Sequence, residues 1–133
     1  GKADIKRRGS DISVITYGTG VHWALEAAEL ILKEGTDVEV LDLRSLMPLD
    51  TPAIIDSVKK TGKVLILHED TLTGGIGGEV AAVVAEKAFE YLDAPIKRVA
   101  SIDSPVPFAP PLEEFFLPNT QKVMNALRDL AAY

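Results

Sequence analysis

The sequence predicts an α/β fold in which a parallel sheet carries helices on both faces. Short apolar segments rich in β-branched residues alternate along the chain with longer segments that have helical periodicity. Right-handed crossovers between such strands build a parallel sheet that is covered on both sides. The 133 residues, of which 47% are hydrophobic, suffice for one compact domain, which we expect to span residues 1–133.

Four segments are typical of buried parallel strands, because each is short and almost continuously apolar at its centre. They are residues 11–17, 37–43, 63–67 and 96–101. Residues 4–8 are a candidate for a further strand at the edge of the sheet, where their charged side chains would reach solvent.

The segments between these strands predict helices. Residues 21–34 place their apolar side chains on one stripe, and Gly35 follows as the stop; the stripe contains Val21, Ala24, Leu25, Ala28, Ile31 and Leu32. Asp50 is expected to cap a second helix, which has Pro52 in its first turn and ends before Gly62.

A third helix is expected over residues 77–92, before Pro95, and a last helix from Asn119. The last helix has one apolar side, made by Val123, Ala126, Leu127 and Leu130. Between them, residues 105–118 contain five prolines and several side chains that need burial: Phe108, Phe115, Phe116 and Leu117. We therefore expect this connection to wrap around the domain rather than serve as a plain linker.

The composition excludes several classes of function. The chain has no cysteine, so a disulfide framework, a thiolate metal site and a catalytic thiol are all ruled out. It has no apolar run long enough to span a membrane. The net charge of −6 disfavours nucleic acid and anionic lipid as partners and leaves a basic protein partner open. The chain starts at Gly1 without a leader, so we expect a piece of a longer, cytoplasmic protein.

Two glycine-rich turns are candidates for phosphate binding. Residues 73–79 join the third predicted strand to its helix, where backbone amides and the helix dipole favour an anion. The spacing does not fit, because the third glycine of a dinucleotide motif is replaced by Val80 and Glu79 adds a carboxylate. Residues 18–20 fail in the same way, since Trp23 occupies the third glycine position. Tight packing of strand against helix is the favoured interpretation of both turns.

The strongest polar cluster is His68, Glu69 and Asp70 at the carboxyl end of a predicted strand, the edge where open α/β sheets bind ligands. Neighbouring strand residues point to opposite faces, so these side chains cannot easily share one metal ion. A structural or interface role is therefore the favoured hypothesis. No serine lies in a nucleophile-elbow motif, and nucleophilic catalysis is not indicated.

Several stretches together resemble one family: DISVITYGTGVHWALEAAELI, DVEVLDLRSLMPLDTPAIIDSVKKTGKVLILHED, TGGIGGEVAAVVAEKAFEYLDAPIKRVASID and PFAPPLEEFFLPN. They resemble the C-terminal domain of the beta subunit of the thiamine-diphosphate-dependent decarboxylating component of 2-oxoacid dehydrogenase complexes, a branch of the transketolase C-terminal-domain family. The likeness covers nearly the whole chain. It implies a three-layer αβα sandwich with a five-stranded, mostly parallel sheet, whose first strand lies antiparallel at an edge beside residues 37–43.

The resemblance also implies what the domain does. The parent enzyme would be an oxidoreductase that decarboxylates a 2-oxoacid, pyruvate or a branched-chain oxoacid, on thiamine diphosphate and acylates lipoyl groups, with acetoin as a further possible substrate. Thiamine diphosphate and magnesium would bind between other domains, so this fragment is expected to hold no catalytic, cofactor or metal residue and to be inactive alone. Its expected role is assembly with the alpha and beta subunits in an oligomer.

The same resemblance implies a docking site for the small, basic peripheral-subunit-binding domain of the acyltransferase core. By position, Asp93 in the stretch YLDAP and the carboxylate of Tyr133 are the candidate contacts. An exposed carboxylate that faces arginine or lysine suits fast, salt-sensitive docking. Four other residues match family positions that we expect to be architectural or interface-forming: His68, Glu69, Gly74 and Gly75.

Two other functions stay open at the level of the sequence. One is a stand-alone, flavodoxin-like domain that binds a nucleotide or small ligand through residues 18–20 and 74–78. The other is the C-terminal domain of a transketolase-type enzyme, which has a related fold and differs mainly in the upstream chain.

Overall fold

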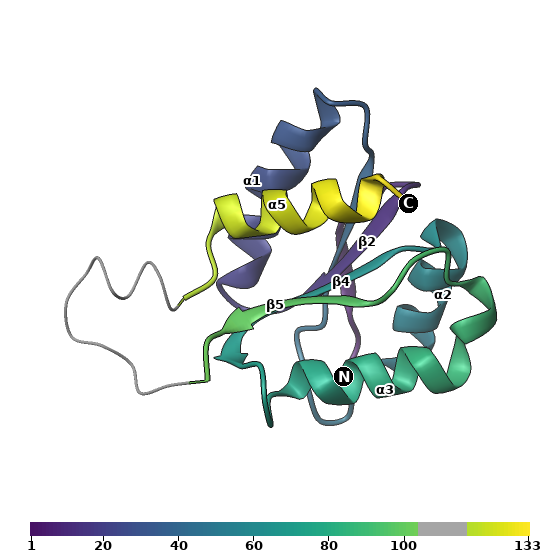
Figure 1. Cartoon of the computed structure of the whole chain (residues 1–133). Coiled ribbons are helices and arrows are strands. Elements are labelled where there is room, and N and C mark those ends of the chain that lie inside the picture. The colour runs from purple at the N-terminus through teal and green to yellow at the C-terminus, as the bar shows by residue number, and fades with distance from the viewer. Residues whose placement is uncertain (104–116) are drawn as a thin grey trace.

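The computed structural model describes residues 1–103 and 117–133, and within them one sheet lies between two layers of helices (Figure 1). The strands are β1 (Asp4–Arg7), β2 (Ile12–Thr16), β3 (Val38–Asp42), β4 (Val64–Thr71) and β5 (Lys97–Ser101). Their order across the sheet is β1-β3-β2-β4-β5. β1 pairs antiparallel with β3, whereas all other pairs are parallel. The predicted α/β fold and its antiparallel edge strand are confirmed.

The helices are α1 (Gly20–Leu32), α2 (Thr51–Thr61), α3 (Ile76–Lys87) and α5 (Thr120–Ala131), with a short 3-10 helix η1 (Phe89–Tyr91). α1 and α5 cover one face of the sheet, and α2 and α3 cover the other (Figure 1). The predicted caps are present, because the side chain of Asp50 accepts a hydrogen bond from Ala53 N–H and that of Asn119 accepts one from Lys122 N–H.

The third helix ends earlier than the sequence predicts. It stops at Lys87, and the buried Ala88 leaves helical geometry with φ −135°. The chain then makes η1, which brings Leu92 back against the apolar layer below α3 and leaves Phe89 73% exposed.

The apolar stripe of α1 also differs from the prediction. Leu32 is 45% exposed and Leu25 is only half-buried, whereas Ala27 is fully buried. The other four predicted residues are buried: Val21, Ala24, Ala28 and Ile31. Together with Ala27, the small residues Ala24 and Ala28 face the core shared with α5. On α5 the predicted side is correct, since Val123, Leu127 and Leu130 have no exposed surface.

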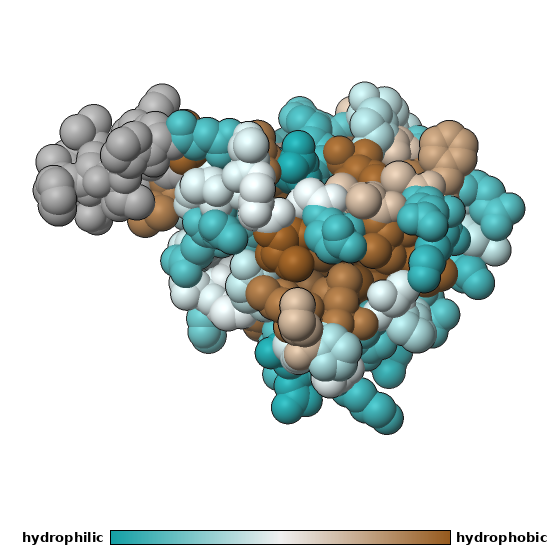
Figure 2. Space-filling view, turned by 90° about the horizontal axis from the view of Figure 1, so that it is seen from below, coloured by the Kyte–Doolittle hydropathy of each residue, from teal (hydrophilic) through white to brown (hydrophobic). Residues whose placement is uncertain are grey.

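One outer face of the molecule carries an apolar area. Figure 2 looks from the side on which α3 lies and shows a brown, hydrophobic area that teal side chains surround. The segment between β3 and α2, at the lower edge of Figure 1, contains Met47, which is 92% exposed. Gly1 lies directly beside Ser45 of the same segment. No helix in the described part of the chain is both long and apolar enough to cross a membrane.

The proline-rich connection lies largely outside the described residues. The predictions for Phe108, Phe115 and Phe116 therefore receive no structural account. Leu117, at the start of the second described range, is half-buried.

Candidate functional site

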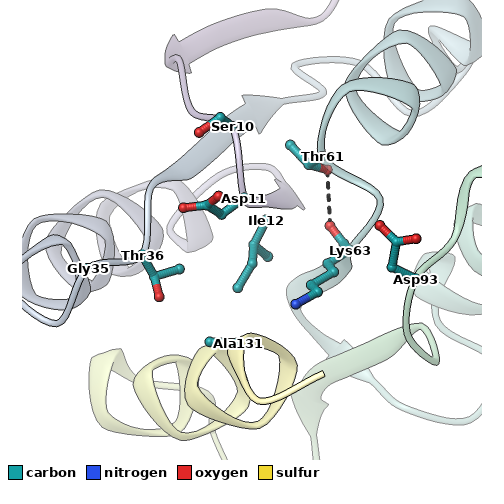
Figure 3. A pocket seen from close by; sticks show the side chains of 9 residues that line it. All are labelled: Ser10, Asp11, Ile12, Gly35, Thr36, Thr61, Lys63, Asp93 and Ala131. Carbon is teal, nitrogen blue, oxygen red and sulfur yellow. Dashed lines mark hydrogen bonds between the residues drawn. The ribbon is translucent and has the colours of Figure 1, made fainter.

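A pocket opens at the edge of the sheet where the parallel strands begin. Its volume is about 390 Å³, and it lies between the start of β2, the ends of α1 and α2, and the last turn of α5 (Figure 3). The lining residues are Ser10, Asp11, Ile12, Gly35, Thr36, Thr61, Lys63, Asp93 and Ala131. We call this region the amino-edge pocket.

Asp93 is fixed at this pocket by its contacts with Gly62. Gly62 ends α2 in the left-handed conformation, with φ +74°, and its carbonyl accepts a 2.8 Å hydrogen bond from Asp93 N–H. The carboxylate of Asp93 lies directly against the position that a Cβ of residue 62 would take. Asp93 is exposed, and its carboxylate has no hydrogen bond or ion pair with any residue in the ranges 1–103 and 117–133.

Lys63 connects the pocket with the end of α5. Its ammonium donates a 2.8 Å hydrogen bond to the main-chain oxygen of Tyr133, whose residue is 66% exposed. The family resemblance singled out Asp93 and Tyr133; Asp93 lines the same pocket as Lys63, and Tyr133 supplies the main-chain oxygen that Lys63 contacts. Nothing in the sequence marked Lys63, since a lysine before a strand is common on protein surfaces.

A buried polar network lies behind the pocket. Glu39 has no exposed surface, and its carboxylate accepts hydrogen bonds from Ser57, at 2.7 Å, and from Lys60. Ser13 in turn bonds Ser57 at 2.6 Å and Thr61 at 2.7 Å. Thr61 also lies 3.2 Å from the carbonyl oxygen of Lys63, the contact drawn in Figure 3. Satisfied buried networks are rigid, so the backbone that carries Lys63 is held in place.

At the opposite edge of the sheet, His68 locks the glycine-rich turn before α3. His68 is 1% exposed; its Nδ1 lies 3.1 Å from the carbonyl oxygen of Asp70, and its Nε2 accepts a 3.1 Å hydrogen bond from Gly77 N–H. These partners require a neutral imidazole with its proton on Nδ1. Burial lowers the pKa of His68, which favours this neutral form. The ring stacks on Tyr17 with centroids 6.4 Å apart.

The glycines of this turn allow the close approach. Gly74 has φ +77°, a conformation that side chains rarely adopt. A Cβ on Gly75 would collide with the carbonyl oxygen of Thr71, and one on Gly77 would collide with the His68 ring. The turn therefore packs β4 tightly against the start of α3, as the sequence predicts.

The polar cluster after β4 does not converge on one point. His68 is buried, whereas Glu69 and Asp70 are exposed. The described residues contain no group of three histidine, aspartate or glutamate side chains placed to hold a metal ion. Nor does the turn suit a diphosphate, because Gly77 N–H already donates to His68 and Glu79 adds negative charge to the first turn of α3. This turn therefore does not fit a diphosphate group.

Comparison with known proteins identifies the family and its relatives. The family model described as "Transketolase, C-terminal domain" matches residues 1–123. The chain is 53% identical, over its full length, to the 2-oxoisovalerate dehydrogenase subunit beta of Bacillus subtilis and covers 41% of that protein. It is 46% identical, over 97% of its length, to the mitochondrial pyruvate dehydrogenase E1 component subunit beta of Saccharomyces cerevisiae and covers 36% of it. It thus spans well under half the length of these relatives.

Solved structures agree with this assignment. A split-gene transketolase, described as an inactive beta4 tetramer, superposes with a TM-score of 0.85 at 27% identity over 98% of this chain and 41% of that one. A 2-oxoglutarate:ferredoxin oxidoreductase from Magnetococcus marinus superposes with a TM-score of 0.66 over 98% of this chain and 20% of that one. Its 12% identity shows likeness of fold alone.

Proposed function

The chain belongs to the family of transketolase C-terminal domains, and from this premise we propose that it is the C-terminal domain of a 2-oxoacid dehydrogenase beta subunit. In this proposal residues 1–133 form one folding unit of a longer polypeptide. The longer enzyme, called the parent enzyme below, is an oxidoreductase that decarboxylates pyruvate or a branched-chain 2-oxoacid and acylates lipoyl groups. The 53% identity to a 2-oxoisovalerate dehydrogenase beta subunit supports the branched-chain choice.

The chemistry of the parent enzyme is assigned to other domains. Thiamine diphosphate would supply the carbanion-stabilising group for decarboxylation. The occupied amide of Gly77 and the scattered carboxylates after β4 support a location of this cofactor, and of magnesium, outside residues 1–133. No catalytic step is therefore assigned to a side chain of this domain. His68, Glu69, Gly74 and Gly75 are given an architectural or interface role.

The domain's own role is to dock a basic partner. The observation that carries this proposal is that Lys63, which lines the amino-edge pocket together with Asp93, donates a hydrogen bond to the main-chain oxygen of Tyr133. Asp93, whose carboxylate has no hydrogen bond or ion pair among the described residues, and the exposed Tyr133 suit an arginine or lysine of another protein. The net charge of −6 favours the approach of such a partner. The partner we propose is the peripheral-subunit-binding domain of the acyltransferase core.

A second role is assembly with the alpha and beta subunits of the parent enzyme. The apolar area in Figure 2 supports this role, because a large exposed apolar patch on a folded protein is typical of an interface. Met47, 92% exposed, belongs to the segment beside Gly1, at which the rest of a longer chain would enter. This face is distinct from the amino-edge pocket.

Two alternative functions are less well supported. A stand-alone nucleotide-binding domain would need free amides at a glycine-rich turn, and Gly77 N–H is already bonded. A transketolase proper is less favoured, because the relatives at 53% and 46% identity carry 2-oxoacid dehydrogenase names. A cytoplasmic location stays a prediction, since one of these relatives is mitochondrial.

Binding of the recombinant peripheral-subunit-binding domain to the parent enzyme tests the docking role. Asp93→Asn is expected to weaken binding by about tenfold or more, because a hydrogen bond to a charged group contributes about 1.5–3 kcal/mol. Asp56→Asn, at an exposed position on α2, makes the same charge change and should leave the affinity unchanged. Equal affinities of wild type and Asp93→Asn would refute the proposed site.

A further inference from the structure

The charged side chains around the amino-edge pocket differ in whether they have hydrogen-bond partners. Among the nine lining residues Lys63 is the one cation, and Asp11 and Asp93 are the carboxylates. Asp11 is engaged, because its carboxylate accepts a 2.7 Å hydrogen bond from Asp37 N–H. Lys63 is turned to the main-chain oxygen of Tyr133, and no ion pair joins it to Asp93. Within residues 1–103 and 117–133, the pocket therefore holds one carboxylate without a hydrogen bond or ion pair and one cation that bonds the main-chain oxygen of Tyr133.

We propose that Lys63 is a built-in competitor of the docking partner's cationic side chain. In the free domain the Lys63 ammonium occupies the Tyr133 oxygen. An incoming arginine or lysine takes this acceptor together with the Asp93 carboxylate, and Lys63 turns out toward solvent. This inference rests on the docking function proposed above and adds to it a residue that sets how tightly, and for which cation, the site binds.

The structure makes Lys63 able to move in this way. Its ammonium has one hydrogen-bond partner, and that partner belongs to an exposed residue. Lys63 is half-buried, but this contact lies at an exposed position, where single lysine contacts are weak and readily exchanged. Lys60 offers the contrast, because its ammonium is paired with the fully buried carboxylate of Glu39. Release of Lys60 would leave a buried charge unpaired, whereas release of Lys63 would not.

The backbone at Lys63 does not move with its side chain. Its carbonyl oxygen accepts a 2.8 Å hydrogen bond from Ser13 N–H and lies 3.2 Å from the Thr61 hydroxyl, which belongs to the buried network. The flexible side chain of Lys63 can therefore move while its backbone stays fixed. The backbone of Asp93 stays bonded to Gly62.

Competition of this kind favours a guanidinium over an ammonium. The planar fork of arginine can donate to two acceptors at once, here the Asp93 carboxylate and the Tyr133 oxygen, whereas one lysine acts as a point charge. An arginine can thus replace the contact of Lys63 and gain that of Asp93 in a single step. A lysine of the partner meets the same repulsion from Lys63 as an arginine does but lacks the planar fork, so it gains less.

The test is the affinity of the parent enzyme for the recombinant peripheral-subunit-binding domain, measured by calorimetry at low and high salt. Lys63→Met keeps the aliphatic stem and removes the charge, and it is expected to tighten binding about two- to fivefold at low salt. Lys63→Arg should bind like wild type. Lys87→Met, at an exposed position in the last turn of α3, changes the net charge equally and should leave the affinity unchanged.

The outcomes separate this inference from the function on which it rests. If wild type binds the domain and Lys63→Met binds equally or more weakly, Lys63 is no competitor and the inference is overturned while docking stands. If wild type does not bind at all, both the docking function and the inference are overturned. Thermal unfolding of Lys63→Met verifies that the variant is folded, and we expect a transition like that of wild type.

Discussion

Gly62 joins two requirements at one residue, a left-handed backbone and space for a neighbouring carboxylate. Its φ of +74° lets α2 end sharply, and its carbonyl holds the backbone of Asp93. A side chain at this position meets both strain and the Asp93 carboxylate. Asp93, the proposed docking residue, is therefore positioned by a glycine far away in the sequence.

Gly62→Ala is expected to lower the free energy of unfolding by about 1–3 kcal/mol and to weaken docking as well. Gly18→Ala is the matched control, because Gly18 has φ +59°, no atom within 4 Å of the added Cβ, and a position after the end of β2, away from the pocket. The control should lose stability without loss of docking. Urea unfolding and calorimetric titration measure the two effects, and intact docking by Gly62→Ala would contradict this positioning role.

His68 makes the stability of the fold depend on pH in a window of its own. Its pKa is lowered from 6.5 by burial, against opposing effects of the Asp70 carbonyl and carboxylate, and Arg98 lowers it further. The unfolded chain then binds a proton below about pH 6.5 that the folded chain does not yet bind. The contribution of neutral His68 to stability is therefore fully present above pH 6.5. It is lost as the pH drops from there through the lower pKa of His68 in the folded state.

His68→Gln is expected to remove this part of the pH dependence, because a glutamine can accept the Gly77 hydrogen bond without titrating. The variant should lose about 1–3 kcal/mol of stability at about pH 8, since the fit of the ring is lost. Urea unfolding between about pH 8 and about pH 5 measures both the loss of stability and its pH dependence. If the free energy of unfolding of the variant fell with pH as steeply as that of wild type, groups other than His68 would cause the pH dependence.

Single residues were predicted unequally well from the sequence. The divergence of His68, Glu69 and Asp70 followed from strand alternation, and it is observed. Asp93 came from the family resemblance alone, because an exposed aspartate carries no distinct pattern, and only the resemblance favoured a partner contact at Tyr133 over a frayed end. Ser13 and Ser57 were missed, since their contact joins a strand and a helix that no local pattern relates.

At the level of elements, α5 closes one face of the sheet. Its Leu127 and Leu130 have no exposed surface and pack against α1, and its first turn is capped by Asn119. The last turn of the helix also forms a long-range contact, since Arg128 pairs with Glu34 of the segment after α1. The position of Tyr133 beside Lys63 depends on this packing.

Leu127→Asp is expected to destabilise the domain by about 4 kcal/mol or more, because it loses apolar burial and strands a charge in the core. Asn125→Asp, at an exposed position on the same helix, is the control and should change stability by less than about 0.5 kcal/mol. Circular dichroism during urea unfolding checks both. A folded, wild-type-like Leu127→Asp would contradict the burial of this face.

Elements were predicted better than single residues, because hydrophobic periodicity records burial directly. The strands and the caps of α2 and α5 agree with the structure. β4 continues to Thr71, past the predicted end at residue 67, because its last residues pair with β5 after they turn polar. α3 ends early, at Lys87, and Leu92 then packs against the apolar cluster that α3 covers. Periodicity alone does not report such a tertiary contact.

At the level of the whole molecule, assembly and docking are assigned to different surfaces. The apolar area of Figure 2 lies on the outer side of the layer formed with α3, and the amino-edge pocket lies where the parallel strands begin (Figures 2 and 3). Such a separation would let one domain hold its neighbours and bind the acyltransferase core at the same time.

Met47→Lys is expected to leave the stability of the domain unchanged, since Met47 is 92% exposed, but to weaken assembly of the parent enzyme by placing a charge in an apolar interface. Leu30→Lys makes a similar change on α1, where Leu30 is 41% exposed, and should leave assembly intact. Analytical ultracentrifugation compares the two. Dissociation of the Leu30 variant alone would place the interface on the other face.

Hydrogen–deuterium exchange of the assembled parent enzyme, with and without the peripheral-subunit-binding domain, tests the location of docking most directly. We predict slower exchange in the segments around Gly62, Asp93 and Tyr133 when the partner binds, and unchanged exchange in the glycine-rich turn at residues 74–78. Protection of that turn, with none at the amino-edge pocket, would contradict the docking surface on which the account rests.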